Sequence, residues 1–220
     1  MTLRPEILRH PNIPKPLHGV APRVVKGREW WDITRQKAYE ESGFRCWACG
    51  VERAPRSQGA FFIPDFDEIE DPVWLEAHEY YDINYKTGRV RLAEVVALCH
   101  ECHNFIHSGR LLAIWRKKEI SPKKALGILE HGFEVLGKAG LQPQAQAAVT
   151  WMTIQGYSEE SIRKMLYSKG LIGSDDYIEP WEAVPWSQWH LEIDGECYYS
   201  RFQNYNEWAA HYGEDPRHLE

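Results

Sequence analysis

The sequence predicts an α+β protein, and three observations support that prediction. The periodic segments run in the order helix, strand, strand, helix, and further helices follow. Two Cys-x-x-Cys pairs flank the two predicted strands, so one metal ion could brace this part of the chain. The C-terminal part alternates around Asp194-Gly195, a dipeptide typical of a β-hairpin, and ends in a short helix.

The chain of 220 residues has room for a core domain with an appendage, and we divide it into three parts. Five prolines within residues 1–27 predict an extended N-terminal arm. Residues 28–120 hold both cysteine pairs and form the predicted zinc-braced domain. Residues 121–220 form a predicted helical region that ends in an acidic, tryptophan-rich hairpin and helix.

The elements of the core domain follow from their periodicity. They are a helix over residues 28–42, a strand over 74–83, a turn over 84–88 and a strand over 89–99. A helix should then start near Glu101, and it either continues past Gly109 or breaks there. Residues 53–73, with three prolines and a group of acids, are predicted to be a loop.

Helix signals continue after the core domain. Ser121 is a suitable N-cap for a helix with Pro122 at its first position. A second helix is expected over residues 144–155. Ser158 and a stripe of apolar residues at helical spacing predict a third.

Composition favours a cytoplasmic protein without a membrane segment. No apolar run is long enough to cross a bilayer, and the charged N-terminus lacks the apolar core of a secretory signal. The net charge is −6, but residues 1–60 and 111–140 are basic and could face a phosphate backbone. Residues 141–220 carry 5 Lys or Arg against 13 Asp or Glu, so a protein partner is the more plausible ligand there.

Four of the five cysteines form the two Cys-x-x-Cys pairs. In a reducing compartment such pairs are expected to bind metal rather than to form disulfides. Each pair places two thiolates on one tight turn, and two such turns complete the tetrahedral shell that zinc prefers. The predicted ligands of this structural zinc ion are Cys46, Cys49, Cys99 and Cys102.

A second candidate metal site begins directly after Cys102. His103 and His107 are four residues apart, so on a helix their imidazoles lie on one face and could chelate one ion. Such a pair is more often structural than ligating, but a zinc ligand next to it would fix where the helix starts. His78, midway along the first predicted strand, is the third histidine of interest.

This order of residues resembles the HNH endonuclease superfamily, in the subset whose metal motif is braced by two Cys-x-x-Cys pairs. The matching segments are Cys46 to Cys49, LEAHE at 75–79 and ALCHECHNFIH at 97–107. The resemblance covers residues 28–112, and a weaker one, to an uncharacterised HNH group, extends to the C-terminus. It implies a ββα-metal (His-Me finger) core that hydrolyses nucleic-acid phosphodiester bonds with magnesium, manganese, nickel or zinc.

When the metal ligands of the family are matched to this sequence by position, the resemblance implies that His78, His103 and His107 hold the second divalent ion. The family's general-base histidine would lie at the next strand position, which is Glu79 here, and its asparagine falls at Glu94. An unperturbed glutamate has a pKa of about 4.3 against about 6.5 for histidine, so it is the weaker base. The predicted catalytic residues are His78, Glu79 and His103.

Two other assignments of the strand residues stay open. His78 could itself be the base, with Glu76 or Glu79 as a ligand of the ion, because strand alternation places Glu76 and His78 on one face. Alternatively, Glu79 is an ordinary carboxylate that faces solvent.

Charged and aromatic residues outside these motifs suggest partners. Arg110, Lys117 and Lys118 are predicted to contact the nucleic-acid backbone, although such residues are often only solvated. The tryptophans of the acidic C-terminal segment are expected to form a small core or a protein-binding face. The sequence therefore favours a metal-dependent endonuclease, and the alternative is a catalytically inactive HNH-like zinc module that binds nucleic acid or protein.

Overall fold

In the computed structural model, the described residues are 2–55, 74–170 and 180–213, and most of the predicted loop at 53–73 lies outside them. They fold as a mixed α+β protein, as the sequence predicts at that level. By their contacts the residues fall into two compact units, and each unit is discontinuous in sequence. Unit 1 comprises Met1–Pro11, Gln36–His78 and Val96–Tyr177, and unit 2 comprises Asn12–Arg35, Glu79–Val95 and Ile178–Glu220.

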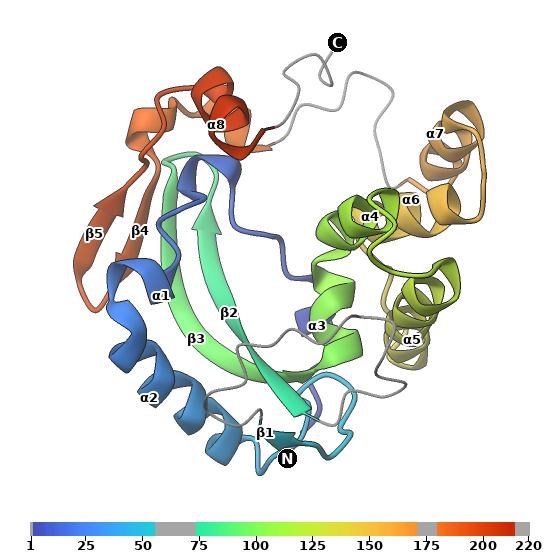
Figure 1. Cartoon of the computed structure of the whole chain (residues 1–220), viewed down its shortest axis with the longest axis horizontal. Coiled ribbons are helices and arrows are strands. Elements are labelled where there is room, and N and C mark those ends of the chain that lie inside the picture. The colour runs from blue at the N-terminus through green and yellow to red at the C-terminus, as the bar shows by residue number, and fades with distance from the viewer. Residues whose placement is uncertain (1, 56–73, 171–179, 214–220) are drawn as a thin grey trace. The chain divides into compact units, whose positions relative to one another are not determined.

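The two long strands predicted from alternation form a hairpin that runs through both units. They are β2 (Trp74–Asn84) and β3 (Arg89–Cys99), and Figure 1 shows β3 leading directly into helix α3 (His100–Ile106). The sheet order is β1-β2-β3-β4-β5, in which the short β1 (Ala54–Pro55) pairs parallel with β2. The end of β3 is buried throughout, so its position, and that of the first residues of α3, is fixed by the core of unit 1.

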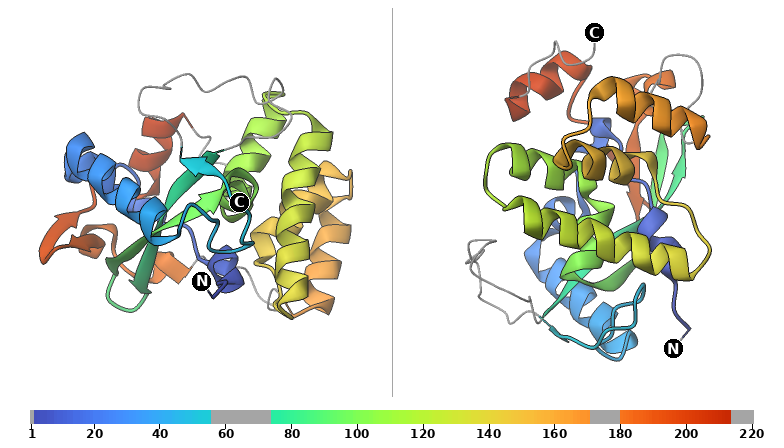
Figure 2. Two further views of the ribbon diagram at one scale, coloured as in Figure 1. Left: turned by 90° about the horizontal axis from the view of Figure 1, so that it is seen from below. Right: turned by 90° about the vertical axis from the view of Figure 1, so that its right-hand side faces the viewer.

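Helices make up most of the rest of unit 1. They are α4 (Ser108–Arg116), α5 (Pro122–Lys138), α6 (Ala145–Ile154) and α7 (Glu159–Ser168), together with the end of α2 (Gly27–Glu41). Helix α5 packs against α3, and α6 contacts α4, α5 and α7 (Figure 2). The side chains of Ser121 and Ser158 accept hydrogen bonds from Lys124 N and Ser161 N, as predicted for N-caps.

The helix that starts after β3 breaks at His107 rather than at Gly109. His107 has ψ of 36°, outside the helical range, and separates α3 from α4. The buried Thr150 side chain of α6 donates a 3.1 Å hydrogen bond to Ser108 O at this junction. A contact from a helix more than 40 residues away therefore helps to set where the break falls, and local propensity alone does not reveal it.

The first residues of the chain are not an extended arm. They form the 3-10 helix η1 (Pro5–Arg9), which packs against α3 and α5. Ile7 and Leu8 are almost completely buried there. Burial of these two apolar side chains explains why the segment packs on unit 1 despite its many prolines.

Unit 2 is built around the other half of the hairpin. Its further elements are η2 (Lys15–Leu17), α1 (Pro22–Val25), η3 (Pro180–Ala183), η4 (Trp186–Gln188), β4 (His190–Ile193), β5 (Glu196–Tyr199) and α8 (Tyr205–Tyr212). Strand β4 pairs parallel with β3 and antiparallel with β5. Asp194 and Gly195 both have positive φ, 53° and 82°, as the predicted two-residue hairpin turn requires.

Two tryptophans of the acidic C-terminal segment contribute to the core of unit 2. Trp189 is fully buried in a cluster with Leu17 and Val90. Trp208 is 3% exposed, and its Nε1 donates a 3.1 Å hydrogen bond to His18 Nδ1. Core packing therefore accounts for these two rings. None of the described helices combines the length and apolar character that crossing a membrane requires.

Candidate metal centres

The first cysteine pair of unit 1 lies on a tight turn. Gly50 N donates to Cys46 O at 2.9 Å, and Gly50 has φ of 80°, a conformation that glycine adopts without strain. Trp47 N, inside the turn, donates to Ala97 O near the end of β3 at 3.0 Å. This hydrogen bond ties the turn that carries Cys46 and Cys49 to the strand that leads to the second pair.

The four cysteine sulfur atoms form a group of the size that zinc needs. Cys99 ends β3, and Cys102 lies in the first turn of α3. All four Sγ atoms lie within 4.8 Å of one another, and Cys49 Sγ is 3.7 Å from Cys99 Sγ. A tetrahedral ion with Zn–S bonds of about 2.3 Å separates its sulfur ligands by about 3.8 Å. This cysteine cluster (Cys46, Cys49, Cys99 and Cys102) therefore fits a metal ion such as zinc.

The thiols of the cysteine cluster do not titrate independently. Hydrogen bonds from the neighbouring thiols, that of Cys102 first, hold the pKa of the Cys49 thiol well below its usual range. Contacts with Cys46, Cys49 and Cys99 raise the pKa of Cys102 instead. Four thiolates this close together repel one another, and a bound cation would remove that repulsion.

A histidine of α5 lies against the cysteine cluster. His131 Nε2 is 3.4 Å from Cys102 Sγ, within hydrogen-bond range for sulfur. A hydrogen bond with the Cys49 thiolate raises the pKa of His131. His131 is 29 residues from Cys102 and belongs to no recognisable motif, so sequence reasoning did not find it.

The three predicted histidines come together next to the cysteine cluster. The ring centroids of His103 and His107 are 4.7 Å apart, and His78 lies 5.5 Å from His103 and 5.1 Å from His107. Each ring offers one nitrogen to a set of atoms that all lie within 4.8 Å of one another. This histidine cluster (His78, His103 and His107) could hold one ion.

The environment keeps two of these imidazoles neutral. Burial, followed by the charges of His103 and His107, lowers the pKa of His78 well below its usual range. Burial first, then the charges of His103 and Arg110, lowers the pKa of His107 to about 3. At neutral pH each of these rings therefore keeps one nitrogen unprotonated, which a metal ligand requires.

The surroundings of His78 test more specifically whether the histidine cluster fits a metal ion. It is 3% exposed, and within the described part of the chain neither of its ring nitrogens has a hydrogen-bond partner. A buried polar group without a partner costs about 1–3 kcal/mol, and buried groups are normally satisfied. A cation held by the histidine cluster would satisfy one of these two nitrogens.

A fourth histidine reaches this cluster from the N-terminal segment. His10 follows η1, is 4% exposed, and lies edge-on to His78 with 5.8 Å between ring centroids. Its charge contributes to the lowered pKa of both His78 and His107. Sequence reasoning assigned the segment to an extended arm, so it gave no reason to place His10 here.

The two carboxylates near His78 in the sequence lie in different places. Glu76 Oε1 is 2.8 Å from His100 Nδ1, and Glu76 Oε2 is 2.6 Å from His103 Nδ1. Glu79 is half-buried on β2 and is not part of the set of mutually close ligand atoms. Its role as a base or ligand stays a prediction.

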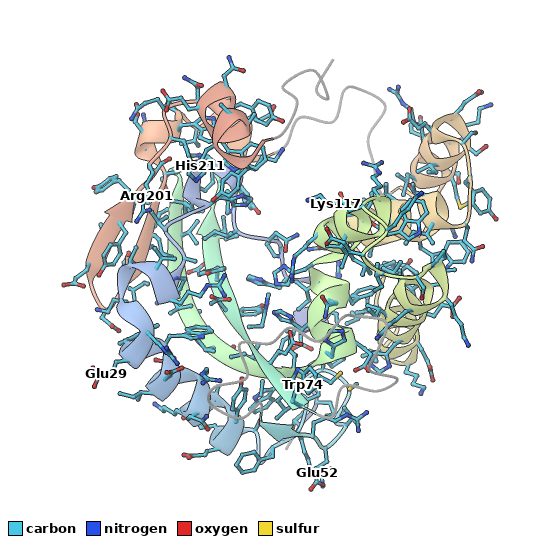
Figure 3. All side chains as sticks on the ribbon, viewed as in Figure 1. Glu29, Glu52, Trp74, Lys117, Arg201 and His211 are labelled. Atoms are coloured by element: carbon cyan, nitrogen blue, oxygen red, sulfur yellow. The ribbon has the colours of Figure 1, made fainter. Side chains whose placement is uncertain are left out.

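The predicted nucleic-acid contacts lie on α4 and just after it. Arg110 is exposed on α4, and it lies near enough to His107 to affect the pKa of that histidine. Lys117 and Lys118 are exposed at the end of the helix, where Figure 3 labels Lys117. These side chains are accessible to a ligand, and their function stays a prediction.

Comparison with known proteins identifies no relative. No protein-family model, no curated protein and no solved structure matches the chain.

Proposed function

We propose that this protein is a metal-dependent endonuclease of the HNH type, with a ββα-metal core formed by β2, β3 and α3. The observation that carries the proposal is the histidine cluster itself: three imidazoles, from β2, from α3 and from the residue just after α3, converge beside a cysteine cluster. The order of elements is the one that the resemblance implies. The cysteine cluster would be structural, and the histidine cluster would hold the ion that acts on the substrate.

The histidine cluster would select the kind of ion. Imidazole nitrogen is preferred by zinc, nickel and other late first-row ions, whereas magnesium prefers oxygen ligands. Three protein ligands leave room for a substrate oxygen at a fourth position. A divalent ion bound there would stabilise the negative charge that develops on the phosphate during hydrolysis.

The chain's own residues would complete the site. His78 and His107 are neutral and available as ligands. Arg110, one turn beyond His107, could neutralise part of the charge of a bound phosphate. The predicted base remains Glu79, which follows His78 on β2. A base that takes the proton of the attacking water typically contributes about 10²–10⁴-fold to the rate.

A cleavage assay tests this proposal. The purified protein is incubated with supercoiled plasmid, linear duplex, single-stranded DNA and structured RNA, in magnesium, manganese, nickel and zinc. Cleavage of at least one substrate is expected, together with its loss in His103→Ala. The Glu79→Ala protein should be slower by about 100-fold or more if this carboxylate is the base. Each variant is checked for zinc content and for its thermal unfolding midpoint.

The alternative is a catalytically inactive HNH-like zinc module that binds nucleic acid or protein. Glu79 and Glu94 favour it, because they stand where the resemblance implies a histidine and an asparagine. Absence of cleavage with every substrate and every ion, in protein with a full complement of zinc, would reject the nuclease and leave this alternative.

A further inference from the structure

Glu76 occupies a position that the proposed function does not use. It lies on β2 two residues before His78, and its side chain is only 20% exposed. One carboxylate oxygen accepts a hydrogen bond from His100 Nδ1 at 2.8 Å. The other oxygen lies 2.6 Å from His103 Nδ1, as an ion-pair contact rather than a well-aligned hydrogen bond. One side chain thus contacts two imidazoles of α3.

The position of Glu76 determines which nitrogen of each imidazole can face an ion. Its two carboxylate oxygens lie against the Nδ1 atoms of His100 and His103, at 2.8 and 2.6 Å. A carboxylate accepts hydrogen bonds and donates none. Each Nδ1 that faces it must therefore carry the hydrogen, which leaves His103 Nε2 with its lone pair for an ion.

We propose that Glu76 is a positioning residue for the histidine cluster, one that holds His103 with Nδ1–H toward β2 and Nε2 toward the ion. The proposal rests on the proposed ion site and deepens it, because it names the residue that sets the orientation of one ligand. Carboxylates that accept from the second nitrogen of a ligating histidine fix its tautomer and make it a better ligand.

The contact with His100 extends this role to the whole helix. His100 is 7% exposed at the first position of α3, and Asn104 Nδ2 donates to His100 O at 2.9 Å. Because Glu76 holds His100 and His103 together, it fixes the rotation of α3 about its axis relative to this part of β2. The same rotation sets the direction in which His103 faces.

Glu76 is not itself a ligand of the ion in this proposal. The set of mutually close ligand atoms comprises the three imidazoles and does not include Glu76. Both of its carboxylate oxygens are already engaged with His100 and His103. The strand therefore contributes one ligand, His78, and one orienting carboxylate.

Glu76→Gln is the variant that tests the proposal. It keeps the shape of the side chain, but an amide offers one acceptor oxygen where the carboxylate offers two, so one imidazole loses its partner. Nickel is titrated calorimetrically into protein whose cysteine cluster is filled with zinc. The affinity for nickel should fall by about 10–100-fold, as for other orienting partners of metal ligands. Asp82→Asn, the same carboxylate-to-amide change at an exposed residue of β2 outside the histidine cluster, is the control and should stay within about threefold of the unaltered protein.

The tautomer of His103 gives a readout that a general loss of packing would not produce. Side-chain ¹H–¹⁵N spectra should show His103 protonated at Nδ1 in the unaltered protein and mixed or reversed in Glu76→Gln, while one zinc per chain is retained. Equal nickel affinity in both proteins, or His103 protonated at Nε2 in the unaltered protein, would overturn the proposal. If the unaltered protein bound no nickel, the ion site would fail instead, and the tautomer would still decide whether Glu76 orients His103.

Discussion

The two clusters of unit 1 share helix α3 but are built in different ways. The cysteine cluster takes its ligands from one tight turn, which a backbone hydrogen bond ties to β3, and from the junction of β3 and α3. The histidine cluster takes its ligands from a strand and a helix, and its rings also contact Glu76 and His10. The first cluster takes every ligand from the two Cys-x-x-Cys pairs, whereas the second also contacts His10, which belongs to no motif.

This difference indicates that the two clusters are suited to different functions. Four thiolates closed around an ion leave no position for a substrate, so the cysteine cluster is suited to stabilise the fold. A group of three imidazoles leaves a position open and is suited to bind an exchangeable ion. Removing a ligand from the first cluster should therefore abolish both sites, whereas removing one from the second should abolish only that site.

The largest effect is expected from Cys99→Ser. Structural zinc sites of this kind contribute about 10–16 kcal/mol of apparent binding free energy to folding, so three ligands should not hold unit 1 together. The zinc content should fall below one per chain, and the cooperative thermal transition of unit 1 should be lost. Cys197→Ser is the matched control, because Cys197 is exposed and outside the cluster. A Cys99→Ser protein with full zinc content and an unchanged melting curve would contradict a structural role.

His107→Ala should weaken ion binding at the histidine cluster and leave the cysteine cluster intact. Nickel affinity at the histidine cluster should fall by more than about 100-fold, since orienting partners alone contribute 10–100-fold. The zinc content and the thermal midpoint should stay close to those of the unaltered protein. His211→Ala, at an exposed histidine of α8, controls for nickel bound at the surface. Loss of zinc in His107→Ala would show that the two clusters do not act separately.

The same contrast explains how much could be predicted from the sequence. The cysteine ligands, the caps at Ser121 and Ser158 and the turn at Asp194-Gly195 depend on residues a few positions apart, and the structure agrees with all of them. Strand alternation also predicted that Glu76 and His78 lie on one face of β2. The sequence could not decide whether Glu76 or Glu79 is the carboxylate that contributes to the ion site. These features are local, so short-range rules suffice.

The features that sequence reasoning missed depend on long-range packing. His10 reaches His78 only because Ile7 and Leu8 bury η1 against α3 and α5. The break at His107 lies where the side chain of Thr150 bonds to the next carbonyl. In each case the partner lies more than 40 residues away, and with a single sequence nothing marks the two residues as neighbours.

Gly132→Ala tests the support of the helix that both clusters share. A Cβ at Gly132 would clash with the ring of the fully buried Phe105 on α3, so α5 and α3 would have to separate. Overpacking of this kind costs about 1–3 kcal/mol and outweighs the better helix propensity of alanine. The matched control is Gly127→Ala in the same helix, where a Cβ meets nothing within 4 Å. Chemical denaturation should show destabilisation for the first and stabilisation by about 0.5–1 kcal/mol for the second.

The smallest effect is expected from His131→Phe, which tests whether the cysteine cluster also depends on a residue that is not one of its ligands. Phenylalanine keeps the ring packed on α5 but cannot donate to sulfur, so the negative charge of the metal-bound thiolates loses one partner. Zinc should pass to a chelator about tenfold faster, which corresponds to about 1.4 kcal/mol, the range of a hydrogen bond to a charged group. Nickel affinity at the histidine cluster should not change, and Glu130→Ala, at the exposed neighbour on α5, should release zinc at the original rate. Unchanged release in His131→Phe would mean that the cysteine cluster needs nothing beyond its four ligands. Faster release would mean that both clusters use outer partners, and that they differ only in how much each depends on them.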